Sequence, residues 1–105
     1  MSSLEEKLRS EMQETRWDAL AIHAERGRLI VVSPQLDLLT AALAIAEDKK
    51  SDVETFISAG LLRKAGGPEI AAFEEEDNPK FQFVIVQPFV LACPIGDEFA
   101  LEALN

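Results

Sequence analysis

The stretch FQFVIVQPFVLACPI, residues 81–95, contains no charged residue, although 28% of the residues in the chain are charged. Its Phe, Val and Ile content favours a strand over a helix, and Pro88 would remove a backbone hydrogen bond inside a helix. The stretch is shorter than the roughly twenty apolar residues of a membrane-spanning helix. We therefore predict a buried central strand in two halves, residues 81–86 and 89–93, with an edge, bulge or bend at Pro88.

The length of the chain fits one small domain. Its 105 residues leave no room for two independent cores, so we expect residues 1–105 to form a single domain, with residues 1–3 and 97–105 frayed. Cys93 is the only cysteine, so an intramolecular disulfide is excluded. The acidic N-terminus lacks the apolar segment of a secretory signal. Together these features predict a cytoplasmic protein.

The charge of the chain argues against two classes of partner. Nineteen acidic residues against ten basic ones give a formal net charge of −9. A field of this sign repels nucleic-acid phosphates and anionic lipids, so we expect no nucleic acid and no membrane as partners. The adjacent basic pairs, Lys49-Lys50 and Arg63-Lys64, have too few basic neighbours to form a binding groove.

The first sixty residues predict a helix, a strand and a helical hairpin. Apolar residues recur at helical spacing from a capping box at the N-terminus to Gly27, which we expect in a left-handed conformation at the end of this helix. Residues 28–32 predict a short buried strand. A helix is expected to start at Ser33-Pro34 and to run to residue 48, and its hairpin partner to cover residues 51–60.

The second half of the chain predicts a short extended segment over residues 61–64 and a helix over residues 68–76, followed by the uncharged stretch. Residues 99–104 could add an amphipathic turn or fray at the terminus. This order of elements predicts an α+β domain in which a small sheet of three or four strands packs against four helices.

Several short motifs together resemble one known family. They are W-x-x-L at residues 17–20, A-x-x-G-R-L-I-V-V from residue 24, LDLL at 36–39, A-x-x-x-A-E-D ending at residue 48, and P-F-V-L at 88–91. This combination is similar to the bacterial domain-of-unknown-function family 2288 and covers most of the chain. That family often has tryptophan at the positions of Phe56 and Phe89, and the segment after Ile95 lies outside its pattern. The resemblance implies one small cytoplasmic bacterial domain and no particular chemistry.

The chain offers few groups for metal or catalytic chemistry. His23 is the only histidine and Cys93 the only cysteine, so a histidine cluster and the cysteine pairs of zinc sites are excluded, and we expect no metal and no cofactor. The acidic run at residues 74–77 lacks the turn glycine of a calcium loop, which indicates a solvated face. A catalytic pair of Cys93 and His23 would require a strand thiol beside the end of the first helix. A buried structural cysteine and a helix-capping histidine are the simpler interpretation.

Trp17, His23, Arg26 and Asp37 remain as weak candidates for a binding site. Trp17 could anchor a partner, although its spacing also fits the edge of a core. Asp37 lies in the first turn of a predicted helix, where a carboxylate complements the helix dipole. The helical hairpin superficially resembles a helix-turn-helix, but its second helix presents acidic side chains where DNA recognition needs basic and amide groups.

We predict a non-catalytic binding or protein-interaction module in the bacterial cytoplasm, because the sequence contains no nucleophile–base pair, metal set or phosphate loop. The alternative is a small ligand-binding enzyme or hydrolase with a site near His23, Arg26 and Asp37, which would need a deep pocket. We also expect a homodimer, because a small sheet with an uncharged stretch leaves edges that a second copy can cover. Residues 99–104 are the alternative cover for such an edge.

Overall fold

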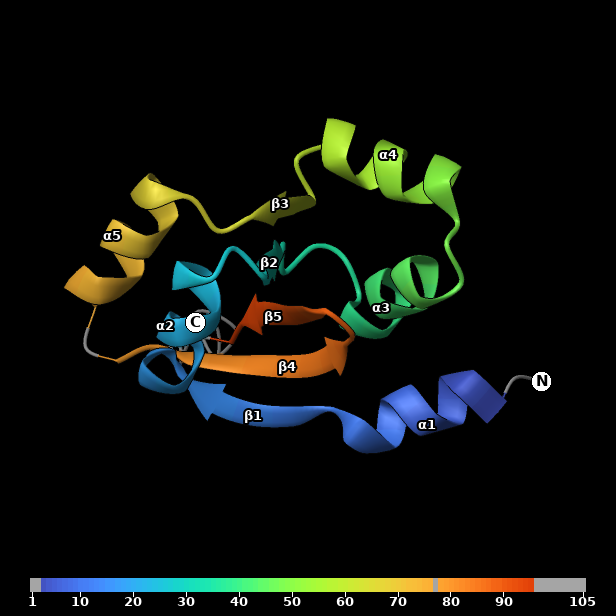
Figure 1. The fold of residues 1–105 in the computed structure, drawn as a ribbon, viewed down its shortest axis with the longest axis horizontal. Helices are drawn as coiled ribbons and strands as arrows, with labels where there is room; N and C mark the ends of the chain where they lie inside the picture. The colour runs from blue at the N-terminus through green and yellow to red at the C-terminus, as the bar shows by residue number, and fades with distance from the viewer. Residues whose placement is uncertain (1–2, 77, 96–105) are drawn as a thin grey trace, which may run out of the picture.

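The computed structural model describes residues 3–76 and 78–95, and these residues form five helices and five strands (Figure 1). The helices are α1 (Ser3–Glu11), α2 (Trp17–Glu25), α3 (Leu38–Ala46), α4 (Lys50–Ser58) and α5 (Gly67–Glu75), and the strands are β1 (Gln13–Arg16), β2 (Leu29–Val32), β3 (Leu62–Lys64), β4 (Lys80–Val86) and β5 (Phe89–Pro94). The predicted α+β class is confirmed. The predicted numbers of strands and helices were each too low.

The strands form one mixed sheet in the order β1-β4-β5-β2-β3. β2 and β5 run parallel, whereas the other neighbouring pairs are antiparallel. β4 and β5 form a hairpin, with Phe81 opposite Pro94 and Val86 opposite Phe89. The uncharged stretch is therefore an antiparallel hairpin that turns at Pro88, and not one strand in two halves.

Helices cover both faces of this sheet and form two hydrophobic cores. On one face, α1, α3 and α4 pack over Leu8, Val32, Leu38, Leu39, Ala41, Ala42, Leu62, Val84, Leu91 and Cys93. On the other face, α2 and α5 pack over Trp17, Leu20, Ala24, Leu29, Phe81, Val90 and Ala92. Because side chains alternate along a strand, the uncharged hairpin supplies apolar groups to both cores. Figure 1 shows α2 and α5 grouped at one end of the strands and the other helices at the opposite end.

The N-terminal region contains a strand where the apolar pattern predicted one continuous helix. α1 ends at Glu11, and β1 then pairs antiparallel with β4, with Thr15 opposite Phe81. The residues of β1 are polar, and most of their side chains are exposed at the edge of the sheet. A polar edge strand shows no regular spacing of apolar residues. The helical spacing before and after β1 was therefore wrongly interpreted as one continuous helix.

Two helices begin at other residues than predicted. α3 begins at Leu38 because Asp37, rather than Ser33, is its N-cap. The Ser33 hydroxyl instead accepts a hydrogen bond from the Gln35 backbone N–H at 3.2 Å, which closes a turn before the helix. α4 begins at Lys50, one residue before the predicted Ser51 cap. The left-handed conformation predicted for Gly27 is confirmed by its φ of +72°.

The edges of the sheet are β1 and β3. β4 and β5 are each paired on both sides, so the predicted exposure of the uncharged stretch at a sheet edge was wrong. The predicted covering segment, residues 99–104, and the predicted frayed ends lie outside the described residues, except for Ser3, which begins α1. In the described part of the chain, every helix is too short or too polar to cross a bilayer.

Candidate functional site

Trp17, the predicted partner anchor or core-edge residue, is the first residue of α2 and packs in the core against α5 and β4. Only 5% of its surface is exposed. Its ring centroid lies 5.1 Å from that of Phe73 and 6.1 Å from that of Phe81. A side chain buried to this extent stabilises the fold and is not available to a partner.

His23, Arg26 and Asp37 are not brought together by the fold. His23 lies in the last turn of α2 and Arg26 is the C-cap of that helix, with its side chain exposed. Asp37 caps the N-terminus of α3. Because α2 and α3 pack on opposite faces of the sheet, these residues do not form one pocket.

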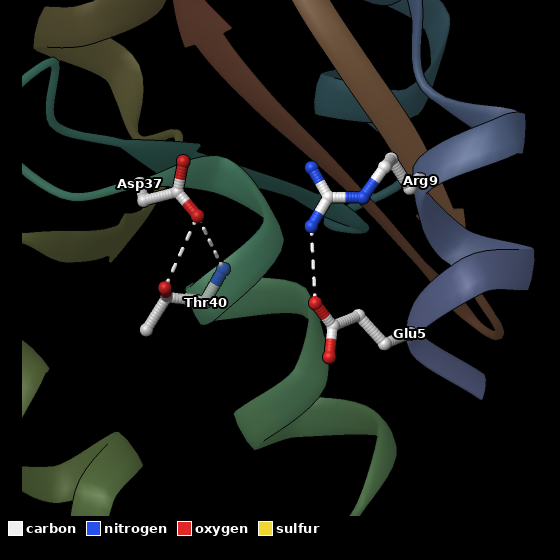
Figure 2. Close-up of polar contacts among 4 residues, drawn as sticks. All are labelled: Glu5, Arg9, Asp37 and Thr40. Atoms are coloured by element: carbon white, nitrogen blue, oxygen red, sulfur yellow. Dashed lines mark hydrogen bonds and ion pairs between the residues drawn. The ribbon is translucent and has the colours of Figure 1, made fainter. Parts of the chain in front are cut away.

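The Asp37 carboxylate has a structural partner in α3. Its Oδ2 accepts hydrogen bonds from the Thr40 backbone N–H at 3.0 Å and from Thr40 Oγ1 at 3.1 Å (Figure 2). This is the geometry of an N-cap, which satisfies a backbone donor that the helix itself leaves unpaired. Figure 2 also shows α1 beside α3, with Arg9 Nη2 bonded to Glu5 Oε2 at 3.0 Å.

A hollow of about 520 Å³, which we name the Asp37 crevice, lies at the carboxyl ends of the parallel strands β2 and β5. It is lined by Pro34, Gln35, Leu36, Asp37, Leu38, Gln82, Cys93, Pro94 and Ile95. In sheets with parallel strands, ligands often bind at this end. Burial and, to a lesser extent, the Asp37 charge raise the pKa of the Cys93 thiol. A protonated thiol is a poor nucleophile, and the only histidine is not among the lining residues, so the crevice has no activated nucleophile.

A second hollow, which we name the α3–α4 groove, has a volume of about 360 Å³ and mostly apolar walls. It is lined by Ile30, Ala44, Ile45, Asp48, Lys50, Val53, Glu54 and Phe89. β2 and β5 supply apolar side chains to it, as do both helices, whereas its charged residues come from the α3–α4 turn and from α4. Apolar walls with a few polar groups are typical of binding sites.

α4 leaves the groove open because it is only partly embedded. No residue of α4 is fully buried, and Val53 and Phe56 are half-buried against the core. Ile57 points outward, with 54% of its surface exposed. The turn that joins α4 to α3 places Asp48 at φ 56°, a left-handed conformation that Asp tolerates better than most residues. α4 therefore stands over the sheet edge as one wall of the groove.

Sequence reasoning missed the α3–α4 groove. Its residues come from four elements, and each taken alone fits an ordinary core position. One available signal was Phe89, an aromatic residue beside Pro88 in the uncharged stretch, since Phe89 lines the groove. Within residues 3–76 and 78–95, no group of three or more His, Cys, Asp or Glu side chains is placed to hold a metal ion.

Comparison with known proteins assigns the family. A family model described as "Protein of unknown function (DUF2288)" matches residues 3–93. The chain belongs to the DUF2288 family. The resemblance inferred from its short motifs is thus confirmed. A comparison of this DUF2288 protein with curated proteins gives no match.

A solved structure has the same fold as this DUF2288 protein. It is the NMR solution structure of PA1075 from Pseudomonas aeruginosa, with 31% sequence identity and a TM-score of 0.79. The similarity covers 93% of this chain and 91% of that one. Neither the family description nor this structure indicates a catalytic function.

Proposed function

We propose that this DUF2288 protein is a non-catalytic protein-interaction module of the bacterial cytoplasm that binds its partner through the α3–α4 groove. The observation that carries this proposal is the composition of the groove. Ile30, Ile45, Val53 and Phe89 provide apolar surface, and the charged groups are carboxylates and one lysine rather than an acid–base pair with a nucleophile. Such a surface gains free energy by taking apolar side chains out of water.

The charge of the groove suggests the chemistry of the partner. Asp48 and Glu54 outnumber Lys50 among its lining residues, and the whole chain carries a formal net charge of −9. Complementary charge speeds association and selects among partners. A volume of about 360 Å³ is at the low end of ligand sites, which suits one or two large side chains. The proposed ligand is therefore a protein segment with an apolar anchor flanked by Lys or Arg.

The same charge supports the proposal that the protein does not bind nucleic acid. α4, the helix that would enter a DNA groove, carries Asp52 and Glu54. These carboxylates would repel phosphates. We expect no binding of a labelled random DNA duplex in fluorescence anisotropy at physiological salt. Micromolar, salt-sensitive binding would contradict this.

A peptide-display selection against the purified protein tests the proposed groove. We expect the enriched peptides to share a Leu, Ile, Phe or Trp anchor with Lys or Arg close to it. Their binding should weaken by about tenfold or more in Val53→Lys, because a charged side chain would stand where the anchor packs. Ile57→Lys is the matched control on the outer surface of the same helix, and it should leave the affinity within about twofold.

Two results would contradict the proposed groove. One is a set of selected peptides that is acidic or has no apolar anchor. The other is an equal effect of Val53→Lys and Ile57→Lys on binding, which would place the contact elsewhere on α4. Far-UV circular dichroism of both variants establishes that α4 is still folded when binding is compared.

A further inference from the structure

β1 is an edge strand of the sheet that the described residues form. It is bonded to β4 on one side, and no strand in the described part of the chain lies on its other side. Figure 1 shows β1 at one margin of the sheet, opposite β3. The side chains of Gln13, Glu14 and Arg16 are exposed and that of Thr15 is half-buried.

The hydrogen bonds of β1 reveal which of its backbone groups point outward. The Trp17 N–H donates to the Pro79 carbonyl at 2.9 Å, next to the pair formed by Arg16 and Lys80. Hydrogen-bonded and non-bonded pairs alternate along an antiparallel ladder. Thr15 therefore directs its backbone groups toward β4, whereas Glu14 and Arg16 direct theirs away from the sheet.

The neighbouring strand supports this assignment independently. The Ile95 N–H donates to the Lys80 carbonyl at 2.9 Å, so the backbone groups of Lys80 face β5 and not β1. Lys80 is the partner of Arg16 in the ladder. The outward direction of the Arg16 N–H follows from both sides of β4, whereas the Arg16 carbonyl, at the N-cap of α2, accepts the first hydrogen bond of that helix.

We propose that β1 pairs antiparallel with β1 of a second copy of this chain, with Glu14 of each copy opposite Arg16 of the other. Outward-directed residues must face one another in such a pair, so Glu14 can oppose Glu14, Arg16 can oppose Arg16, or Glu14 can oppose Arg16. The first two registers bring like charges together at the two-fold axis. The third pairs opposite charges on both sides of the axis and places Thr15 against Thr15, both favourable cross-strand pairs.

The other edge strand does not offer the same complementarity. β3 contains Arg63 and Lys64, and pairing it with its own copy would bring basic side chains together. Arg63 is already engaged with a carboxylate, since its Nε lies 2.6 Å from Glu69 Oε2. Pairing of β1 with β3 of another copy would be heterologous and would extend into an open chain instead of closing as a dimer.

The proposed dimer does not depend on the proposed partner binding. β1 and β3 are the opposite edges of the sheet, and α4 packs beside β3 (Figure 1). A β1–β1 interface therefore leaves the α3–α4 groove of each copy open. Peptide binding should survive in a monomeric variant, so the two proposals can fail separately.

Replacement of an outward-pointing backbone donor tests the dimer. Light scattering coupled to size exclusion should report twice the mass of one chain at a concentration on the order of 100 µM, as expected for a small interface. Glu14→Pro removes a donor that faces solvent in the monomer, a position where an edge strand tolerates proline, and should give a monomer. Lys64→Pro is the matched control on β3. The Ser33 N–H donates to the Leu61 carbonyl at 2.9 Å, and bonded and non-bonded pairs alternate along the ladder from that pair. The Lys64 N–H therefore also points away from the sheet. This variant should remain a dimer.

Charge exchange supplies a second test that does not rely on proline. Glu14→Arg or Arg16→Glu alone should raise the dimer dissociation constant by about tenfold or more, because each places like charges opposite each other twice. The double variant Glu14→Arg/Arg16→Glu restores opposite charges and should return within about threefold of the parent. Each single change also alters an exposed contact within the chain: Glu14 contacts Lys80, and Arg16 donates to the Asn78 carbonyl. Recovery of the dimer in the double variant is therefore the decisive result.

The outcomes separate cleanly. A dimer lost in Glu14→Pro, kept in Lys64→Pro and recovered by charge exchange supports the proposed register. A monomeric parent at this concentration, a dimeric Glu14→Pro, or a double variant that stays monomeric overturns it. Loss of assembly in Lys64→Pro also overturns it, because β3 would then be part of the interface. If Glu14→Pro proves unfolded by circular dichroism, the charge-exchange series decides.

Discussion

The ring centroids of Trp17 and Phe73 lie 5.1 Å apart with an interplanar angle of 48°, and this contact joins α2 to α5. Phe81 of β4 completes the cluster, with its ring edge-on to Phe73 at 5.1 Å. α5 has no fully buried residue of its own. The aromatic cluster is therefore a principal contact between α5 and the rest of the domain.

We expect Trp17→Ala to lower the free energy of unfolding by about 3–5 kcal/mol, because it removes a buried indole and leaves a cavity. That is a large share of the about 5–15 kcal/mol that stabilises a small domain. Urea denaturation measures the change. Trp17→Phe keeps an aromatic ring against Phe73 and should cost less. Full stability of Trp17→Ala would contradict this packing role.

Gly27 links α2 to β2 through a left-handed conformation. Its φ is +72°, and a Cβ built there would meet nothing within 4 Å, so the cost of adding a Cβ comes from the backbone conformation. We expect Gly27→Val to destabilise the domain by at least about 1–2 kcal/mol in urea denaturation. Gly67→Val is the control, since Gly67 also has open space around its Cβ position but no positive φ. Equal stability of the two variants would contradict this prediction.

The central sheet and the later helices were predictable because their residues carry strong local signals. The uncharged stretch marks the middle of the sheet, and Gly27 and Gly60 end helices at positive φ. β1 was not predictable in this way, because an edge strand with polar side chains has no apolar period to detect. Its existence depends on pairing with β4, which is more than sixty residues later in the chain.

The functional surfaces depend on how the elements are packed, which local patterns do not encode. His23, Arg26 and Asp37 are close in sequence, but β2 lies between them and its flanking helices pack on opposite faces. The α3–α4 groove unites Ile30 with Phe89, although many residues separate them, because β2 and β5 are parallel neighbours. Only the parallel pairing brings these side chains together.

Cys93 should react slowly with alkylating reagents. Its burial raises the pKa of the thiol, and the Asp37 charge adds to the same shift. We expect alkylation by iodoacetamide to be slow at neutral pH and to accelerate only above the pKa of an ordinary cysteine. Asp37→Asn should speed the reaction only slightly, because burial is the larger cause and Asn still caps α3. Alkylation of the folded parent as fast as that of a free thiol would contradict this.

The stability of the domain should depend on pH through Glu69. Its Oε1 accepts a hydrogen bond from the Gly66 backbone N–H at 3.1 Å, and its Oε2 lies near Arg63. The Gly66 bond, and more weakly Arg63, hold the pKa of Glu69 below its ordinary value of 4.5, although partial burial opposes them. A carboxyl group whose pKa is lower in the folded state stabilises the fold above its unfolded pKa, and this contribution is lost as pH falls through the folded pKa.

We therefore expect Glu69→Gln to be less stable than the parent at pH 7 in urea denaturation, and this difference to shrink once the pH falls below the ordinary glutamate value. Glu75→Gln, at the exposed end of α5, controls for the loss of one negative charge from the same helix. An NMR titration of Arg63→Ala distinguishes the two causes, because the Gly66 bond should still hold the pKa of Glu69 below normal. A return of that pKa to the ordinary value in Arg63→Ala would show that the ion pair, and not the backbone N–H, is the main cause.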